Sequence, residues 1–173
     1  MFQGWTSYYQ MTGGASATLV ALLFVVATLT ESREPSQVLR AVSIYLTPTA
    51  LHFGIVLAIS GLALVPRLSS AAIAGLMGFG AVVGLGNGLW ACLGMRRRSP
   101  GADPPHWSDF WLYGAAPSAI YLALGGVSVA LWAGAAWGPY AVAALLLALL
   151  LLGVRNAWDL VTWIASRRGR PPQ

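Results

Sequence analysis

Residues 71–95 read AAIAGLMGFGAVVGLGNGLWACLGM and contain no charged side chain. An apolar run of this length crosses a hydrocarbon core of about 30 Å as a helix that rises about 1.5 Å per residue. Because lipid offers the backbone no hydrogen-bond partner, such a run folds as a helix. Four further apolar runs flank it, at about 13–30, 41–64, 110–133 and 140–165. We therefore predict an all-α membrane protein, a bundle of five transmembrane helices in a single domain spanning 1–173.

The overall composition agrees with a lipid environment. Hydrophobic residues make up 57% of the chain and charged residues 9%, whereas a soluble domain carries about 25% charged residues. Water could not solvate so uncharged a surface, so the bilayer is the expected partner. The net charge of +5 is explained by arginines that set topology and meet anionic lipid headgroups, and we expect no nucleic-acid partner.

The basic residues are unevenly distributed. All ten are arginines, and with five spans eight of them fall on one face of the membrane. These eight occupy the 31–40 loop, the 96–109 loop and the C-terminal tail, at Arg33, Arg40, Arg96, Arg97, Arg98, Arg167, Arg168 and Arg170. The opposite face carries only Arg67. Because cytoplasmic loops retain positive charge, we predict an outside N-terminus and a cytoplasmic C-terminus.

His52 is the first candidate functional residue. Counted from Ala41 at the inner face, it lies about 16 Å into the second span, near the middle of the bilayer. Ionisable groups at that depth usually face a cavity or a partner, and an imidazole with an ordinary pKa of about 6.5 can sense pH or pass protons. The structural alternative is a neutral imidazole bonded to a helix carbonyl or to a Thr or Tyr of a neighbouring helix. A third interpretation is that His52 is a ligand to a metal or a cofactor.

Further polar residues fall in the inner half of the predicted bundle. Arg155 and Asp159 are four residues apart in the last span, so they share a helix face and can pair, and Arg155 is close enough to the inner boundary to snorkel. The full set of pore or proton-sensing candidates is His52, Asn87, Tyr121, Arg155, Asn156 and Asp159. A polar cavity open to the cytoplasm would have this pattern, and so would a polar cluster packed between helices.

Gly80, Gly84 and Gly88 repeat every four residues in the third span. This doubled GxxxG pattern forms a groove on one helix face and favours close helix packing, within the subunit or between copies. Pro48 and Pro117 are expected to kink the second and fourth spans.

No motif identifies a catalytic, metal or cofactor site. The sequence has no CxxC, HExxH or phosphate-binding glycine loop and no GxSxG nucleophile. The two histidines are His52 and His106, and the second falls in a loop, so bis-histidine haem ligation within the bundle does not fit. We predict no catalytic residue, no metal and no cofactor, and the sequence points away from an enzyme without excluding one.

Two stretches carry a resemblance. Residues 12–26 read TGGASATLVALLFVV after an aromatic segment, and residues 155–160 read RNAWDL. Both resemble stretches in a loose family of small, uncharacterised bacterial polytopic membrane proteins. The resemblance implies a bacterial cytoplasmic (inner) membrane location and transfers no activity and no catalytic residue. Arginine without lysine, with abundant Ala, Gly and Leu, is typical of a GC-rich bacterial genome and points the same way.

Three functions remain open on these observations. The first is an oligomeric channel or small transporter with a cytoplasm-facing polar cavity; because five spans enclose little space, a pore would need several copies. The second is a non-catalytic accessory or assembly subunit that docks onto partner membrane subunits. The third is a membrane enzyme acting on lipid or quinone.

Overall fold

The computed structural model describes residues 2, 4–28, 46–96, 108 and 110–167. Every regular element in these ranges is a helix, which confirms the predicted all-α class. Several predictions concern residues outside the described ranges: residues 41–45 of the second span, His106, and the arginines at 33, 40, 97, 98, 168 and 170.

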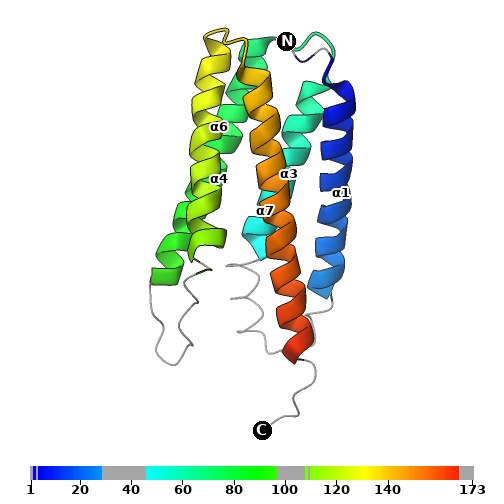
Figure 1. Cartoon of the computed structure of the whole chain (residues 1–173), viewed down its shortest axis with the longest axis vertical. Coiled ribbons are helices and arrows are strands. Elements are labelled where there is room, and N and C mark those ends of the chain that lie inside the picture. Colours follow the sequence, from blue (N-terminus) through cyan, green and yellow to red (C-terminus); the bar gives the residue numbers. More distant parts are fainter. Residues whose placement is uncertain (1, 3, 29–45, 97–107, 109, 168–173) are drawn as a thin grey trace.

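The helices run up and down in a single elongated bundle (Figure 1). They are α1 (Thr6–Thr28), α3 (Thr47–Ala63), α4 (Ser70–Arg96), the π-helix η2 (Phe110–Ala115), α6 (Ala116–Trp132) and α7 (Gly138–Arg167). The helix α4 packs along α6, α1 packs along α3, and α7 contacts both α3 and α6. The ends of α4 and α7, which carry Arg96 and Arg167, lie at the same end of the bundle, and the turn with Arg67 lies at the other (Figure 1).

Four of these helices are long and apolar enough to cross a membrane. They comprise Thr6–Thr28, Ser70–Leu93, Phe110–Trp132 and Gly138–Thr162. The helix α3 is apolar but has 17 residues, about 25 Å at the helical rise, and residues 41–45 before it are not described. The structure therefore shows four membrane-length helices with a shorter fifth packed among them.

The first helix starts earlier than the sequence predicted, at Thr6 instead of about residue 13. Aromatic packing explains this extension. The ring of Trp5 stacks edge-on against Tyr140 at the start of α7, the Tyr8 hydroxyl donates to the carbonyl of Ala143, and Tyr9 is almost completely buried. These contacts hold the first helical turns against α7, so the aromatic segment belongs to the bundle.

Apolar side chains cover the outside of the bundle as well as its interior. The core contains fully buried Phe53, Met77 and Leu124, yet Phe79 and Val129 are 70% and 71% exposed on the outer surface. Since a helix that is hydrophobic all round is stable in lipid or in a large core, and five helices provide no large core, these features are those of an integral membrane protein.

The expected kinks at Pro48 and Pro117 stay predictions, and the two prolines are the second residues of α3 and α6. The residues just before these helices, Leu46 and Ala115, already have helical backbone angles, so helical backbone leads into both α3 and α6. For Pro117 the preceding turn is the π-helix η2, which joins α6 through Ala115 with helical backbone angles. The wider π turn relieves the clash between a proline ring and the carbonyl four residues earlier.

Candidate functional site: a buried histidine–tyrosine pair and a polar joint

His52 and Tyr121 form a hydrogen-bonded pair in the middle of the bundle. The Nδ1 atom of His52 lies 2.7 Å from the hydroxyl of Tyr121, and both side chains have 0% exposure. Tyr121 is at the centre of the membrane-length helix Phe110–Trp132. The sequence placed both residues among the candidates, and the structure brings them together across α3 and α6.

The helix α4 makes room for this pair at Gly84. A β-carbon built on Gly84 would overlap the ring of Tyr121, so the ring lies directly against the α4 backbone. One turn further, a β-carbon on Gly88 would overlap the Ser118 hydroxyl of α6, whereas one on Gly80 would meet only Ile55 of α3 at 3.8 Å. Gly84 and Gly88 therefore lie against α6 of the same chain.

The hydrogen bond favours one form of the imidazole. If Tyr121 donates to Nδ1, the ring proton is on Nε2, and this N–H alone lacks a partner among the described residues. If Nδ1–H donated instead, the Tyr121 hydroxyl hydrogen and the Nε2 lone pair would both need partners. Since each unpaired buried group costs about 1–3 kcal/mol, we infer that Tyr121 donates and that Nε2 carries the proton.

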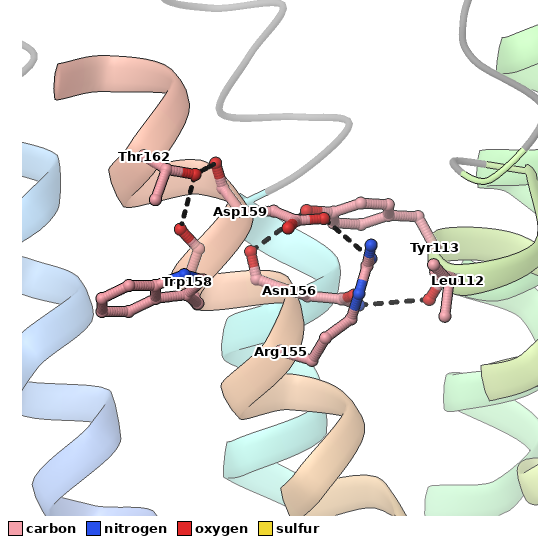
Figure 2. A network of polar contacts seen from close by, with 7 residues as sticks. All are labelled: Leu112, Tyr113, Arg155, Asn156, Trp158, Asp159 and Thr162. Atoms are coloured by element: carbon pink, nitrogen blue, oxygen red, sulfur yellow. Dashed lines mark hydrogen bonds and ion pairs between the residues drawn. The ribbon is translucent and has the colours of Figure 1, made fainter. Parts of the chain in front are cut away.

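A second polar cluster joins α7 to η2 (Figure 2). Asn156, fully buried, donates from Nδ2 to the carbonyl of Leu112 at 3.1 Å. The hydroxyl of Tyr113 donates to the backbone carbonyl of Asn156 at 3.0 Å. Leu112 lies five residues before Pro117, which has no N–H to complete a π-type hydrogen bond. Asn156 supplies a donor at that point of the helix.

Arg155 and Asp159 form the ion pair that their spacing predicts. The Nη1 atom of Arg155 is 2.8 Å from Oδ2 of Asp159, and the two side chains are 41% and 40% exposed. Arg155 also makes a long contact of 3.4 Å to Oδ1 of Asn156. Figure 2 shows the pair on the flank of α7 while Asn156 reaches across to Leu112. The pair is thus peripheral to the buried part of the cluster.

Asn87 belongs to neither hydrogen-bonded group. Its Oδ1 atom is buried and has no hydrogen-bond partner among the described residues. Within those same residues, no hydrogen bond or ion pair joins His52 and Tyr121 to the Arg155 cluster. The six predicted candidates therefore separate into a central pair, a cluster on α7 and a lone asparagine.

Interhelical hydroxyl bonds are the part of the polar interior that the sequence reading missed. Thr12 of α1 and Ser60 of α3 share a hydrogen bond of 3.0 Å. Ser16 donates to the carbonyl of Phe53, and Ser128 of α6 donates to the carbonyl of Ala74 in α4. Ser and Thr are common in apolar helices, so the sequence signal was weak. A β-carbon built on Gly13 would lie 3.1 Å from the Ser60 side chain, so α1 packs tightly against α3 at this point.

The described residues contain no group of three or more His, Cys, Asp or Glu side chains able to hold a metal ion. Comparison with known proteins adds no relative: no family model, curated protein or solved structure matches this chain.

Proposed function

We propose that this chain is a small channel or transporter of a bacterial cytoplasmic membrane, built from several copies, with the His52–Tyr121 pair as its functional centre. One observation carries the proposal. A fully buried imidazole in the middle of an apolar bundle uses one ring nitrogen for Tyr121 and leaves the other without a partner among the described residues. Ionisable groups at membrane depth are expensive and mark ion or proton pathways.

The arrangement of the core supports more than one copy. Tyr121, Phe53 and Leu146 are all fully buried at the centre of the bundle, so side chains fill the space that a pore through one subunit would need. Gly84 and Gly88 already pack against α6. Contacts between copies would therefore use the outer apolar faces, and the predicted cytoplasm-facing polar cavity remains part of the proposal.

The orientation in the membrane is part of the proposal. The helices α4 and α7 end with Arg96 and Arg167 at one end of the bundle, whereas the turn between α3 and α4, which contains Arg67, lies at the other (Figure 1). Because positive charge is retained in the cytoplasm, we place the Arg96 and Arg167 end inside, with the N-terminus outside. The resemblance of residues 12–26 and 155–160 to small bacterial membrane proteins agrees with this location.

Proteoliposomes test the proposal directly. The purified chain is reconstituted at controlled copy number, and the flux of protons and of small monovalent ions is followed with enclosed dyes. Flux above that of protein-free liposomes, reduced in His52→Leu, supports the proposal. A monomeric particle in mild detergent together with no flux for any of these ions would overturn it.

A second candidate function is an accessory subunit of a larger membrane complex. It is favoured by the interhelical bonds of Thr12, Ser16 and Ser128 to neighbouring helices, because hydroxyl groups bonded in this way hold the helices in a fixed scaffold. Purification in mild detergent discriminates the two readings. Stoichiometric recovery of other membrane proteins would favour the accessory role, and recovery of self-copies alone would exclude it.

A further inference from the structure

Two buried polar atoms on adjacent helices have no hydrogen-bond partner among the described residues: Nε2 of His52 on α3 and Oδ1 of Asn87 on α4. Buried polar atoms in native proteins nearly always have a partner, either in the protein or in an ordered water molecule. The helices α3 and α4 pack against each other. The two atoms therefore call for a common explanation.

Their hydrogen-bonding types are complementary. In the arrangement inferred above from the unpaired groups, Tyr121 donates to Nδ1 of His52, so Nε2 carries a hydrogen and is a donor. Asn87 presents an amide oxygen, which can only accept. The atoms do not bond directly to each other within the described structure, but a molecule that both accepts and donates would satisfy both.

The helix register places Asn87 on the face of α4 that meets α3. Asn87 is seven residues from Gly80, about two helical turns, so both lie on the same face of α4, and Gly80 lies against Ile55 of α3. Asn87 is also three residues beyond Gly84, about 4.5 Å along the axis. Gly84 is the residue against which the Tyr121 partner of His52 packs. Asn87 thus lies on the α3 side of α4, about one turn from the level of the pair.

We propose that His52 and Asn87 bind one water molecule between α3 and α4, which accepts from Nε2–H and donates to Oδ1. Buried waters typically make two to four hydrogen bonds, and these two atoms supply the first two. The resulting chain runs from Tyr121 through His52 and the water to Asn87 and links α6, α3 and α4. The water site stands on the geometry, whereas its use as a proton-relay element rests on the proposed function.

Nitrogen NMR of the full chain in lipid bicelles tests the site. With ¹⁵N-labelled histidine, we expect a protonated Nε2, an unprotonated Nδ1, and a cross-peak between the Nε2 proton and slowly exchanging water. In Asn87→Ala the water cross-peak is lost and the Nε2 resonance shifts. Thr18→Val, which removes an exposed hydroxyl bonded within its own helix, leaves both unchanged.

Several outcomes would overturn the inference: no water cross-peak in the wild type, a proton on Nδ1, or an Nε2 resonance unmoved by Asn87→Ala. The wild-type spectrum alone decides the matter if the variant fails to fold. The result is also separable from the proposed function. A water signal in a protein without flux would support the water site and contradict the channel. Flux without a water signal would support the channel and contradict the water site.

Discussion

The ring of Tyr121 lies against the backbone of Gly84, at a position where any β-carbon would overlap its atoms. This contact joins the α4–α6 interface to the buried His52 pair, since the same tyrosine holds His52 through its hydroxyl. A change at Gly84 should therefore be felt both in stability and at the histidine.

Gly84→Ala is expected to destabilise the bundle. The added methyl group displaces a fully buried ring, and overpacking of this kind costs about 1–3 kcal/mol. Gly86 provides a matched control in the same helix, because a β-carbon there meets nothing within 4 Å, and Gly→Ala in an open helical position stabilises by about 0.5–1 kcal/mol. Thermal unfolding in mild detergent should separate the two variants in opposite directions; equal shifts would contradict the packing described.

Asn156→Leu should be clearly destabilising. It leaves the carbonyl of Leu112 without the side-chain donor that reaches it at 3.1 Å, and an unpaired buried group costs about 1–3 kcal/mol. Tyr113→Phe, which removes the hydroxyl that bonds the Asn156 carbonyl, should lower stability in the same range. Unfolding midpoints measured for both variants check this, and wild-type stability in Asn156→Leu would show that the cluster does not hold η2 to α7.

Arg155→Gln and Asp159→Asn should hardly alter stability. Their ion pair is about two-fifths exposed and is predicted to lie near the inner boundary, where Arg155 can reach water, and solvent-exposed pairs contribute about 0–1 kcal/mol. The double variant should resemble either single variant in its unfolding midpoint. A loss comparable to that of Asn156→Leu would mean that the pair supports the buried cluster after all.

Topology can be read from chemical labelling. In a Cys92→Ala background, Ser69→Cys in the turn between α3 and α4 should react with a membrane-impermeant thiol reagent in intact cells. Gln173→Cys should react only after the cells are opened, because the arginine-rich end is retained in the cytoplasm. The reverse pattern would invert the proposed orientation, and labelling of both sites in intact cells would exclude three membrane crossings between Ser69 and Gln173.

The sequence predicted the helices well because their signal is thermodynamic and local. An uncharged run such as 71–95 has no alternative to a helix in lipid, and the i, i+4 spacing of Arg155 and Asp159 allowed the pairing that the structure shows. Boundaries were harder. Aromatic packing of Trp5 on Tyr140 extends α1 to Thr6, and a contact between residues so distant in the chain leaves no local trace.

The candidate site was only partly accessible from the sequence. His52 was conspicuous because ionisable residues are rare in apolar runs. Its partner, however, depends on how α6 is rotated about its axis, because only one rotation points Tyr121 toward α3. That choice is decided by Gly84, whose missing side chain admits the ring. The role of Asn156 depends on the π-helix before Pro117. A proline indicates that the helical hydrogen bonding is interrupted nearby, but it does not indicate that the interruption is a π-helix.

The most direct test of the central claim compares two tyrosine variants in proteoliposomes. Tyr121→Phe keeps the ring against Gly84 and removes only the hydroxyl that bonds His52, whereas Tyr140→Phe makes the same chemical change at a side chain that is 67% exposed. We predict that proton or ion flux changes at least several-fold in Tyr121→Phe and stays at the wild-type level in Tyr140→Phe. Identical flux in the wild type and both variants would contradict a functional role for the His52–Tyr121 pair.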